Sequence, residues 1–245
     1  MALPVVWYRV APGGSSGCNC ITIDENRVRV LNGTECASKG MPPAGRTRID
    51  LKKKFKFLYD ASPKEVSVVD VPKLRFLMVD GQGAPEAQSF QDGIRTLYNL
   101  AYTIKFGLKK SRGIEYPVMA LEGLWSSGAS AVGFDVQARD KWRWTLMMMQ
   151  PDAVTHDVVE KASEEIRKKG RSLAEFRLDG FHEGLSVQIM HVGPYSTESA
   201  TIQKIQEFMK QNGYALNGRH HEIYLGDPRR AAPSKLRTVL RHPVK

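Results

Sequence analysis

The feature that most constrains the fold of this chain is an internal repeat. Two segments, at about residues 72–150 and 183–245, have the same order of secondary-structure signals. Each begins with an apolar stretch that ends at a glycine, Gly81 in the first copy and Gly193 in the second. An amphipathic helix, a strand with a glutamate and a last strand follow in both copies. The repeat therefore predicts a duplicated strand-helix-strand-strand unit.

The two predicted helices indicate how the sheet is covered. Their apolar stripes lie within residues 90–108 and 202–209, and Glu86 and Glu198 lie near the helix N-termini, where the helix dipole favours acids. A sheet with helices on one face buries alternate residues there and leaves the other alternation to line a groove. We predict an α+β fold in which both units form one curved antiparallel sheet, with helices on one face and a ligand groove on the other. The first helix should be longer by about three turns.

The first 50 residues differ in character from the rest of the chain. They are rich in Gly, Ser, Pro and Asn, and their only clear pattern is a possible hairpin within residues 21–30. We predict that residues 1–50 are an N-terminal extension of unknown role and that residues 51–245 form the globular domain. Because its apolar residues are sparse, the extension should contribute little to stability.

Composition argues against several classes of protein. No run approaches the about 18 apolar residues of a membrane span, and the N-terminus does not resemble a signal peptide, so we expect a cytoplasmic protein. The formal net charge of +10 comes from short basic groups interrupted by acids or apolar residues, which favours a solvated surface over nucleic-acid binding. The three cysteines lie in the first 36 residues without zinc-site spacing, and no His-Glu-x-x-His motif is present, so neither metal nor cofactor is expected.

The run 220–225 carries the most specific chemistry in the sequence. Strand alternation places Glu222 and Tyr224 on one face and Ile223 and Leu225 on the other. We expect the apolar pair to meet the helices, so that Glu222 and Tyr224 point together into the groove. A carboxylate with apolar neighbours can attract a cationic ligand or, with a raised pKa, serve as an acid or base. The alternative is an exposed glutamate beside a tyrosine at the rim of the sheet.

Aromatic side chains could form the walls of such a pocket. Trp142 and Trp144 share one face of a strand, where they could stack flat ligands or hold cations, although both could equally be core residues. Glu122 occupies a strand of the first copy that corresponds to the strand of Glu222, so we expect the two acids to be equivalent. The predicted ligand-binding residues are Trp142, Trp144, Tyr195, Glu122 and Trp125, the last being out of phase with Glu122.

Taken together, these residues resemble the GyrI-like small-molecule-binding family. The similarity extends from about Leu51 to Val244 and is carried by four segments, at residues 121–125, 142–145, 188–195 and 220–230. These segments resemble the stand-alone bacterial subgroup more closely than the effector domains of multidrug-sensing transcription activators. The family fold is a duplicated strand-helix-strand-strand unit, which agrees with the repeat found above.

The resemblance implies a site and a range of functions. It assigns the family's pocket acid to Glu222 and its neighbouring tyrosine to Tyr224, and it implies a hydrophobic or cationic aromatic small molecule as the partner, without a cofactor. Some members of the stand-alone subgroup resemble hydrolases that open the strained cyclopropane ring of DNA-alkylating natural products. Three functions remain open: binding alone for detoxification, hydrolysis through Glu222 with Tyr224 or Tyr195 as hydrogen-bond donor, and, by family analogy only, gyrase inhibition.

Overall fold

The protein divides into two units, residues 1–47 and 48–245. The structure, a computed structural model, describes residues 8–9, 20–24, 27–31, 46–127 and 141–245. Described strands of the first unit are β1 (Tyr8–Arg9), β2 (Cys20–Asp24) and β3 (Arg27–Leu31), which form a sheet in the order β1-β2-β3. The hairpin expected within residues 21–30 is confirmed, because Ile21 pairs with Val30. Cys18 and Cys36, which lack zinc-site spacing in the sequence, lie outside the described residues.

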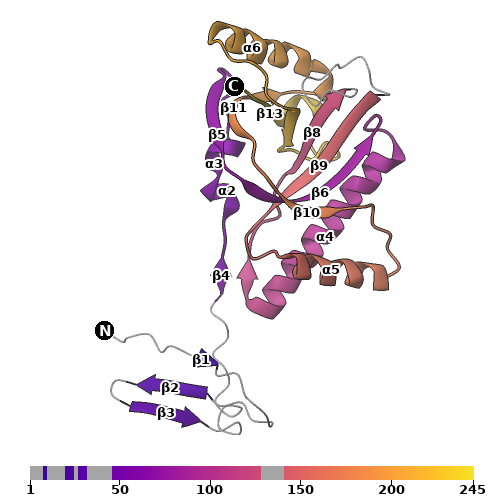
Figure 1. Cartoon of the computed structure of the whole chain (residues 1–245). Helices are drawn as coiled ribbons and strands as arrows, with labels where there is room; N and C mark the ends of the chain where they lie inside the picture. The colour runs from indigo at the N-terminus through magenta and orange to yellow at the C-terminus, as the bar shows by residue number, and fades with distance from the viewer. Residues whose placement is uncertain (1–7, 10–19, 25–26, 32–45, 128–140) are drawn as a thin grey trace. The chain divides into compact units, whose positions relative to one another are not determined.

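The second unit is built on one curled antiparallel sheet, as Figure 1 shows. Among the described residues eight strands form this sheet, in the order β10-β6-β9-β8-β12-β13-β11-β5. In chain order they are β5 (Ser67–Val71), β6 (Leu74–Gln82), β8 (Leu121–Ser127), β9 (Trp142–Gln150), β10 (Arg177–Phe181), β11 (Gly184–Val192), β12 (His220–Tyr224) and β13 (Arg237–Pro243). The predicted α+β class is confirmed.

Helices and short elements connect these strands. The α-helices are α2 (Leu51–Lys54), α3 (Lys56–Tyr59), α4 (Gln88–Arg112), α5 (His156–Lys168) and α6 (Glu198–Gln211). The shorter elements are β4 (Thr47–Arg48), β7 (Ile114–Glu115) and the 3₁₀ helices η2 (Tyr195–Thr197) and η3 (Pro233–Lys235). No described helix is long and apolar enough to cross a membrane.

The repeat has the predicted order, β6-α4-β8-β9 followed by β11-α6-β12-β13, and its two halves meet where β8 pairs with β12. Two strands were not predicted, β5 and β10, and both join the opposite half. β5 precedes the first copy but pairs with β11, while β10 precedes the second copy but pairs with β6. Each half therefore completes the edge of the other, which makes residues 48–245 one interlocked unit.

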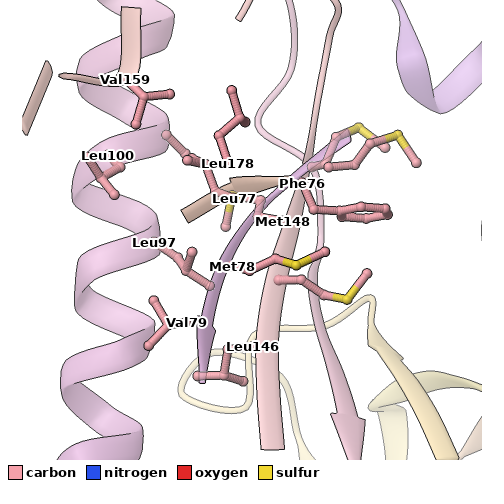
Figure 2. Close-up of a cluster of buried hydrophobic side chains, with 14 of the residues drawn as sticks. Phe76, Leu77, Met78, Val79, Leu97, Leu100, Leu146, Met148, Val159 and Leu178 are labelled. Carbon is pink, nitrogen blue, oxygen red and sulfur yellow. The ribbon is translucent and has the colours of Figure 1, made fainter. Parts of the chain in front are cut away.

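The long helix α4 packs on the first half of the sheet and beside α5 (Figure 1). It has 25 residues and α6 has 14, which confirms the expected difference of about three turns. Figure 2 shows Leu97 and Leu100 of α4 in the same cluster of buried side chains as Val79 and Leu146 of the sheet. These four side chains are almost completely buried. α4 ends at Gly113, whose positive φ of 65° provides a left-handed helix cap.

Strand pairing shows which face of the sheet carries Glu222. Cross-strand partners point to the same face, and Glu222 pairs with Gly123, which in turn pairs with Leu146. Gly93 of α4 lies directly over Leu146. Glu222 is therefore on the face that the long helix covers, and the expectation that Ile223 meets the helices is wrong. Polarity could not reveal this phase, because β12 is buried on both faces.

The opposite face of the sheet is covered by the chain between β4 and β5. Nη2 of Arg241 donates to the carbonyl oxygen of Leu58 at 2.6 Å, and the hydroxyl of Tyr59 donates to Oε1 of Glu122 at 2.7 Å. Arg241 and Glu122 are almost fully buried. This segment therefore supplies hydrogen bonds to charged groups that cannot reach water.

The connection between this segment and the sheet leads to a prediction for two truncations. Removing residues 1–47 should leave the melting temperature of the second unit nearly unchanged, because the contacts among residues 48–245 remain. Removing residues 1–63 should destabilise it by about 3–5 kcal/mol, the usual cost of leaving buried charged groups without partners. Thermal and urea unfolding of both truncated chains would check this. Equal melting temperatures would show that Leu58 and Tyr59 do not stabilise the sheet.

Two glycines provide a matched pair for testing how tightly the Trp144 ring packs across Gly81. A Cβ atom at Gly81 would overlap the Trp144 ring, whereas a Cβ at Gly107 of α4 would meet nothing within 4 Å. Gly81→Ala should therefore destabilise the protein by about 1–3 kcal/mol through overpacking. Gly107→Ala should stabilise it by about 0.5–1 kcal/mol, because alanine loses less conformational entropy in a helix. Urea unfolding should give opposite signs, and a neutral Gly81→Ala would contradict the packing.

Candidate functional site

Glu222 lies at the centre of a hydrogen-bonded row on β12. Its Oε2 accepts a hydrogen bond from the hydroxyl of Tyr224 at 2.8 Å, and its Oε1 lies 3.0 Å from Nε2 of His220. The indole N–H of Trp125 on β8 donates to the Tyr224 hydroxyl at 3.1 Å. Strand alternation places His220, Glu222 and Tyr224 on one face, and the β8–β12 pairing brings Trp125 beside them. These two contacts fix the orientation of the Glu222 carboxylate, and 9% of the residue's surface is still exposed.

A second histidine extends the row onto β13. Nδ1 of His220 lies 2.7 Å from Nε2 of His242. Burial, together with the neighbouring His220, lowers the pKa of His242 to about 3, so this ring is neutral under ordinary conditions. A neutral His242 that donates its Nε2–H to His220 leaves Nε2–H of His220 free to donate to Glu222. The pair thereby directs a hydrogen-bond donor at the carboxylate.

A second carboxyl group, Glu198, faces this site from the first turn of α6. Burial raises its pKa, and the negative charge of Glu222 raises it further, to about 9. The α6 dipole favours an ionised acid at this position, but desolvation and the neighbouring charge outweigh it. Glu198 is 7% exposed, and its Oε1 has no hydrogen-bond partner among the described residues. At neutral pH Glu198 is therefore a buried, protonated acid beside the charge of Glu222.

Aromatic rings flank the carboxyl groups. The ring of Tyr195 meets that of Tyr224 edge-on, with centroids 5.8 Å apart, and Tyr195 is 40% exposed. Trp125 meets Trp142 in a similar T-shaped contact at 5.7 Å. Three of the residues expected to bind ligand, Tyr195, Trp125 and Trp142, therefore form one aromatic cluster with Tyr224.

Trp144 occupies a different environment. Its ring packs edge-on against Phe90 of α4 at a centroid distance of 5.1 Å and lies across Gly81. Only 2% of its surface is exposed. Trp144 is thus placed in the core beneath α4.

Glu122 is also in a different place from the one expected. Its cross-strand partner is Ile223, so Glu122 lies on the opposite face of the sheet from Glu222. The expectation that Glu122 and Glu222 are equivalent is wrong, because their side chains point to opposite faces of the sheet. Glu122 instead contacts Nε2 of His221 at 3.0 Å and accepts a hydrogen bond from Tyr59.

His221 is the centre of a charged network on that second face. Its Nδ1 lies 3.0 Å from Glu183, to which Arg241 donates at 3.1 Å. Burial alone would lower the pKa of His221, but the charge of Glu183 and hydrogen bonds to Glu122 and Glu183 raise it to about 9. Burial likewise opposes ionisation of Glu183, yet His221 and Arg241 lower its pKa to about 2. The acids and bases of this network pair with one another, so we assign it a role in stabilising the fold.

Sequence reasoning did not include Glu198, His220 or His242 in the site. The signal for His220 was present, because strand alternation places it on the same face as Glu222. Glu198 was explained by its helix terminus alone, and nothing in the sequence linked His242 to β12. Among the described residues, no group of three or more His, Cys, Asp or Glu side chains is arranged to hold a metal ion.

The duplicated sheet, with a buried glutamate held beside aromatic rings, defines a class of small-molecule-binding α+β domains. The chain belongs to the GyrI-like family: the model of the GyrI-like small molecule binding domain matches residues 64–245. None of the curated proteins matches this chain.

Solved structures from Listeria innocua are similar to this chain. An uncharacterized conserved protein is 40% identical with a TM-score of 0.74, over 80% of this chain and 100% of the Listeria chain. A hydrolase is 39% identical with a TM-score of 0.73, over 81% of this chain and 100% of its own. The similarity therefore includes the full length of both Listeria proteins.

The raised pKa of Glu198 predicts how stability depends on pH. The unfolded chain ionises this group above about 4.5, whereas the folded protein keeps it protonated up to about 9, so Glu198 costs stability increasingly between these values. Glu198→Gln removes this cost. We therefore expect Glu198→Gln to raise the free energy of unfolding more near pH 9 than below pH 4.5, by at least about 1.4 kcal/mol, the value of one pKa unit.

Urea unfolding of Glu198→Gln at both pH values checks this prediction. Glu207→Gln is the matched control, because Glu207 is an exposed glutamate on the same helix. An effect of Glu198→Gln that does not change with pH would mean that Glu198 has an ordinary pKa.

Proposed function

We propose that this protein is a cofactor-independent hydrolase of flat, hydrophobic electrophiles, with Glu222 as the general base. The observation that carries this proposal is the pairing of Glu222, held by Tyr224 and His220, with the protonated Glu198. A carboxyl group that its surroundings keep protonated can act as an acid beside a carboxylate that acts as a base. The 39% identity to a Listeria hydrolase supports the same reaction type.

The proposed substrate is a strained cyclopropane ring conjugated to a carbonyl group. Glu222 accepts a proton from water while the water oxygen bonds to a ring carbon. The ring carbon–carbon bond breaks, its electron pair moves into the conjugated carbonyl, and the carbonyl oxygen takes the proton of Glu198. Return of the water-derived proton from Glu222 to Glu198 restores both groups. Ring opening consumes the electrophilic carbon, so the proposed role is detoxification of alkylating compounds.

The other site residues position these groups and the substrate. Tyr224 donates its hydroxyl to Glu222, so it orients the base and leaves Glu198 as the available acid. Tyr195, 40% exposed, provides a ring on which a flat substrate can stack, while the almost fully buried Trp125 and Trp142 pack against each other beside Tyr224. Such stacking supplies orientation, which is a large part of catalysis for a reaction with water.

The second candidate function is binding without turnover. The carboxylate of Glu222 lies among aromatic rings, an arrangement that suits a cationic aromatic compound through charge and cation–π contacts. In that case the protein sequesters its ligand. The two functions differ in whether the bound compound changes chemically.

A substitution of Glu222 tests the proposal. Glu222→Gln keeps the shape of the side chain but removes its basicity. With a spirocyclopropyl cyclohexadienone as substrate, we expect wild-type protein to yield the water adduct, measured by mass spectrometry, and Glu222→Gln to lower the rate by about 100-fold or more. Tryptophan fluorescence should show that the variant still binds the compound.

Glu160→Gln is the matched control, because Glu160 is an exposed glutamate on α5. It should react at the wild-type rate. Binding of the dienone without formation of the adduct by wild-type protein would exclude hydrolysis of this substrate. Weaker binding of a cationic aromatic compound to Glu222→Gln, by about 1–3 kcal/mol, would then support sequestration.

A further inference from the structure

A cavity of about 650 Å³ lies at the end of β9, away from Glu222. Its walls come from α2, β6, β9, β10 and the start of α5, and none of its lining residues belongs to the Glu222 site. The volume lies within the range of typical small-molecule pockets. Its apolar lining includes Leu51, Phe55, Met149 and Leu178.

Two exposed lysines, Lys54 and Lys73, line this cavity. Lys54 and Lys73 form no ion pair with any residue in the described part of the chain. The ammonium group of Lys54 lies 5.0 Å from the ring centroid of Phe55. Cε of Lys73 lies only 2.6 Å from the position of a Cβ at Gly180, so Lys73 can cross β10 there because residue 180 has no side chain. Both lysines are thus available to a negatively charged group.

The remaining charged groups of the lining have other contacts or lie at the exposed side. The guanidinium of Arg75 donates to the carbonyl oxygen of Val154 at 2.8 Å. Asp179 accepts a hydrogen bond from the backbone N–H of Gly180 at 2.7 Å, and Asp152 is exposed. The lining contains three basic side chains and two acidic ones, so its formal charge is positive.

Gln150 provides a polar group in the wall of this cavity. It is only 4% exposed, and its Nε2 donates to the carbonyl oxygen of Met148 at 3.2 Å. Its Oε1 has no donor among the described residues. A buried carbonyl oxygen without a donor is unfavourable, so a ligand that brings an N–H or O–H group would satisfy it.

We propose that this cavity is a second ligand site, which binds an organic carboxylate with a hydrophobic body. The carboxylate lies between Lys54 and Lys73, and the body packs against the apolar lining. A hydroxyl or amide N–H group on the body donates to Gln150. The site takes an anion, whereas the Glu222 site has a negative charge of its own, so the two sites select different ligands.

Fluorescence of 8-anilinonaphthalene-1-sulfonate, an anion with a hydrophobic body, tests the proposal on the full chain, with decanoate as the competing carboxylate. We expect saturable binding that decanoate displaces. The double variant Lys54→Met, Lys73→Met should weaken both ligands at least about tenfold, the factor expected for loss of one charge-assisted contact. The matched control Lys52→Met, Lys64→Met has the same change in charge, and both lysines are exposed and absent from the lining.

The affinities of the variants for the probe show whether the cavity is its binding site. Weakening in the cavity variant, with wild-type affinity in the control and in Glu222→Gln, would support it. Equal affinities in the cavity variant and wild type would overturn it, as would equal weakening in the control. Loss of binding in Glu222→Gln would place the probe at the other site and also overturn it. Failure of the dienone reaction leaves this result unaffected, because the probe does not react.

Discussion

The pairing of β8 with β12 is the constraint on which the rest of the structure depends. It joins the two halves of the repeat, and β12 is buried on both of its faces. Alternation along this strand sends Glu222 to the face beneath the helices and His221 to the other. Each buried polar group must then find partners on neighbouring elements, since an unpaired one is costly. The positions of His242, Tyr224 and Tyr59 follow from that requirement.

The two faces meet this requirement differently. On one face the acids Glu122 and Glu183 are matched by His221 and Arg241, and this network holds the chain before β5 on the sheet. On the other face two acids, Glu222 and Glu198, lie together, and one of them stays protonated. A buried acid with a strongly raised pKa is unfavourable for folding and is typical of functional sites. This contrast is why we place the chemistry beneath the helices.

Much of the fold could be predicted from the sequence, but the phase of β12 could not. The apolar stripes and glycine boundaries identified the repeat, its connecting helices and the length of α4. β5 and β10 were missed because their short, Asp-containing sequences, Ser67–Val71 and Arg177–Phe181, complete the opposite half of the sheet. Strand alternation alone predicted that Glu222 and Tyr224 lie together on one face of β12. Glu198 could not be predicted as a site residue, because its pKa depends on the way α6 packs on β11 and β13.

A ¹³C NMR titration of the glutamate side-chain carboxyl carbons measures whether Glu198 remains protonated beside Glu222. We expect one carboxyl resonance that titrates near pH 9 and that disappears in Glu198→Gln. The resonances of the exposed Glu160 and Glu207 serve as internal references. A spectrum in which every glutamate is already ionised at neutral pH would contradict this assignment, because the site would then contain no protonated acid.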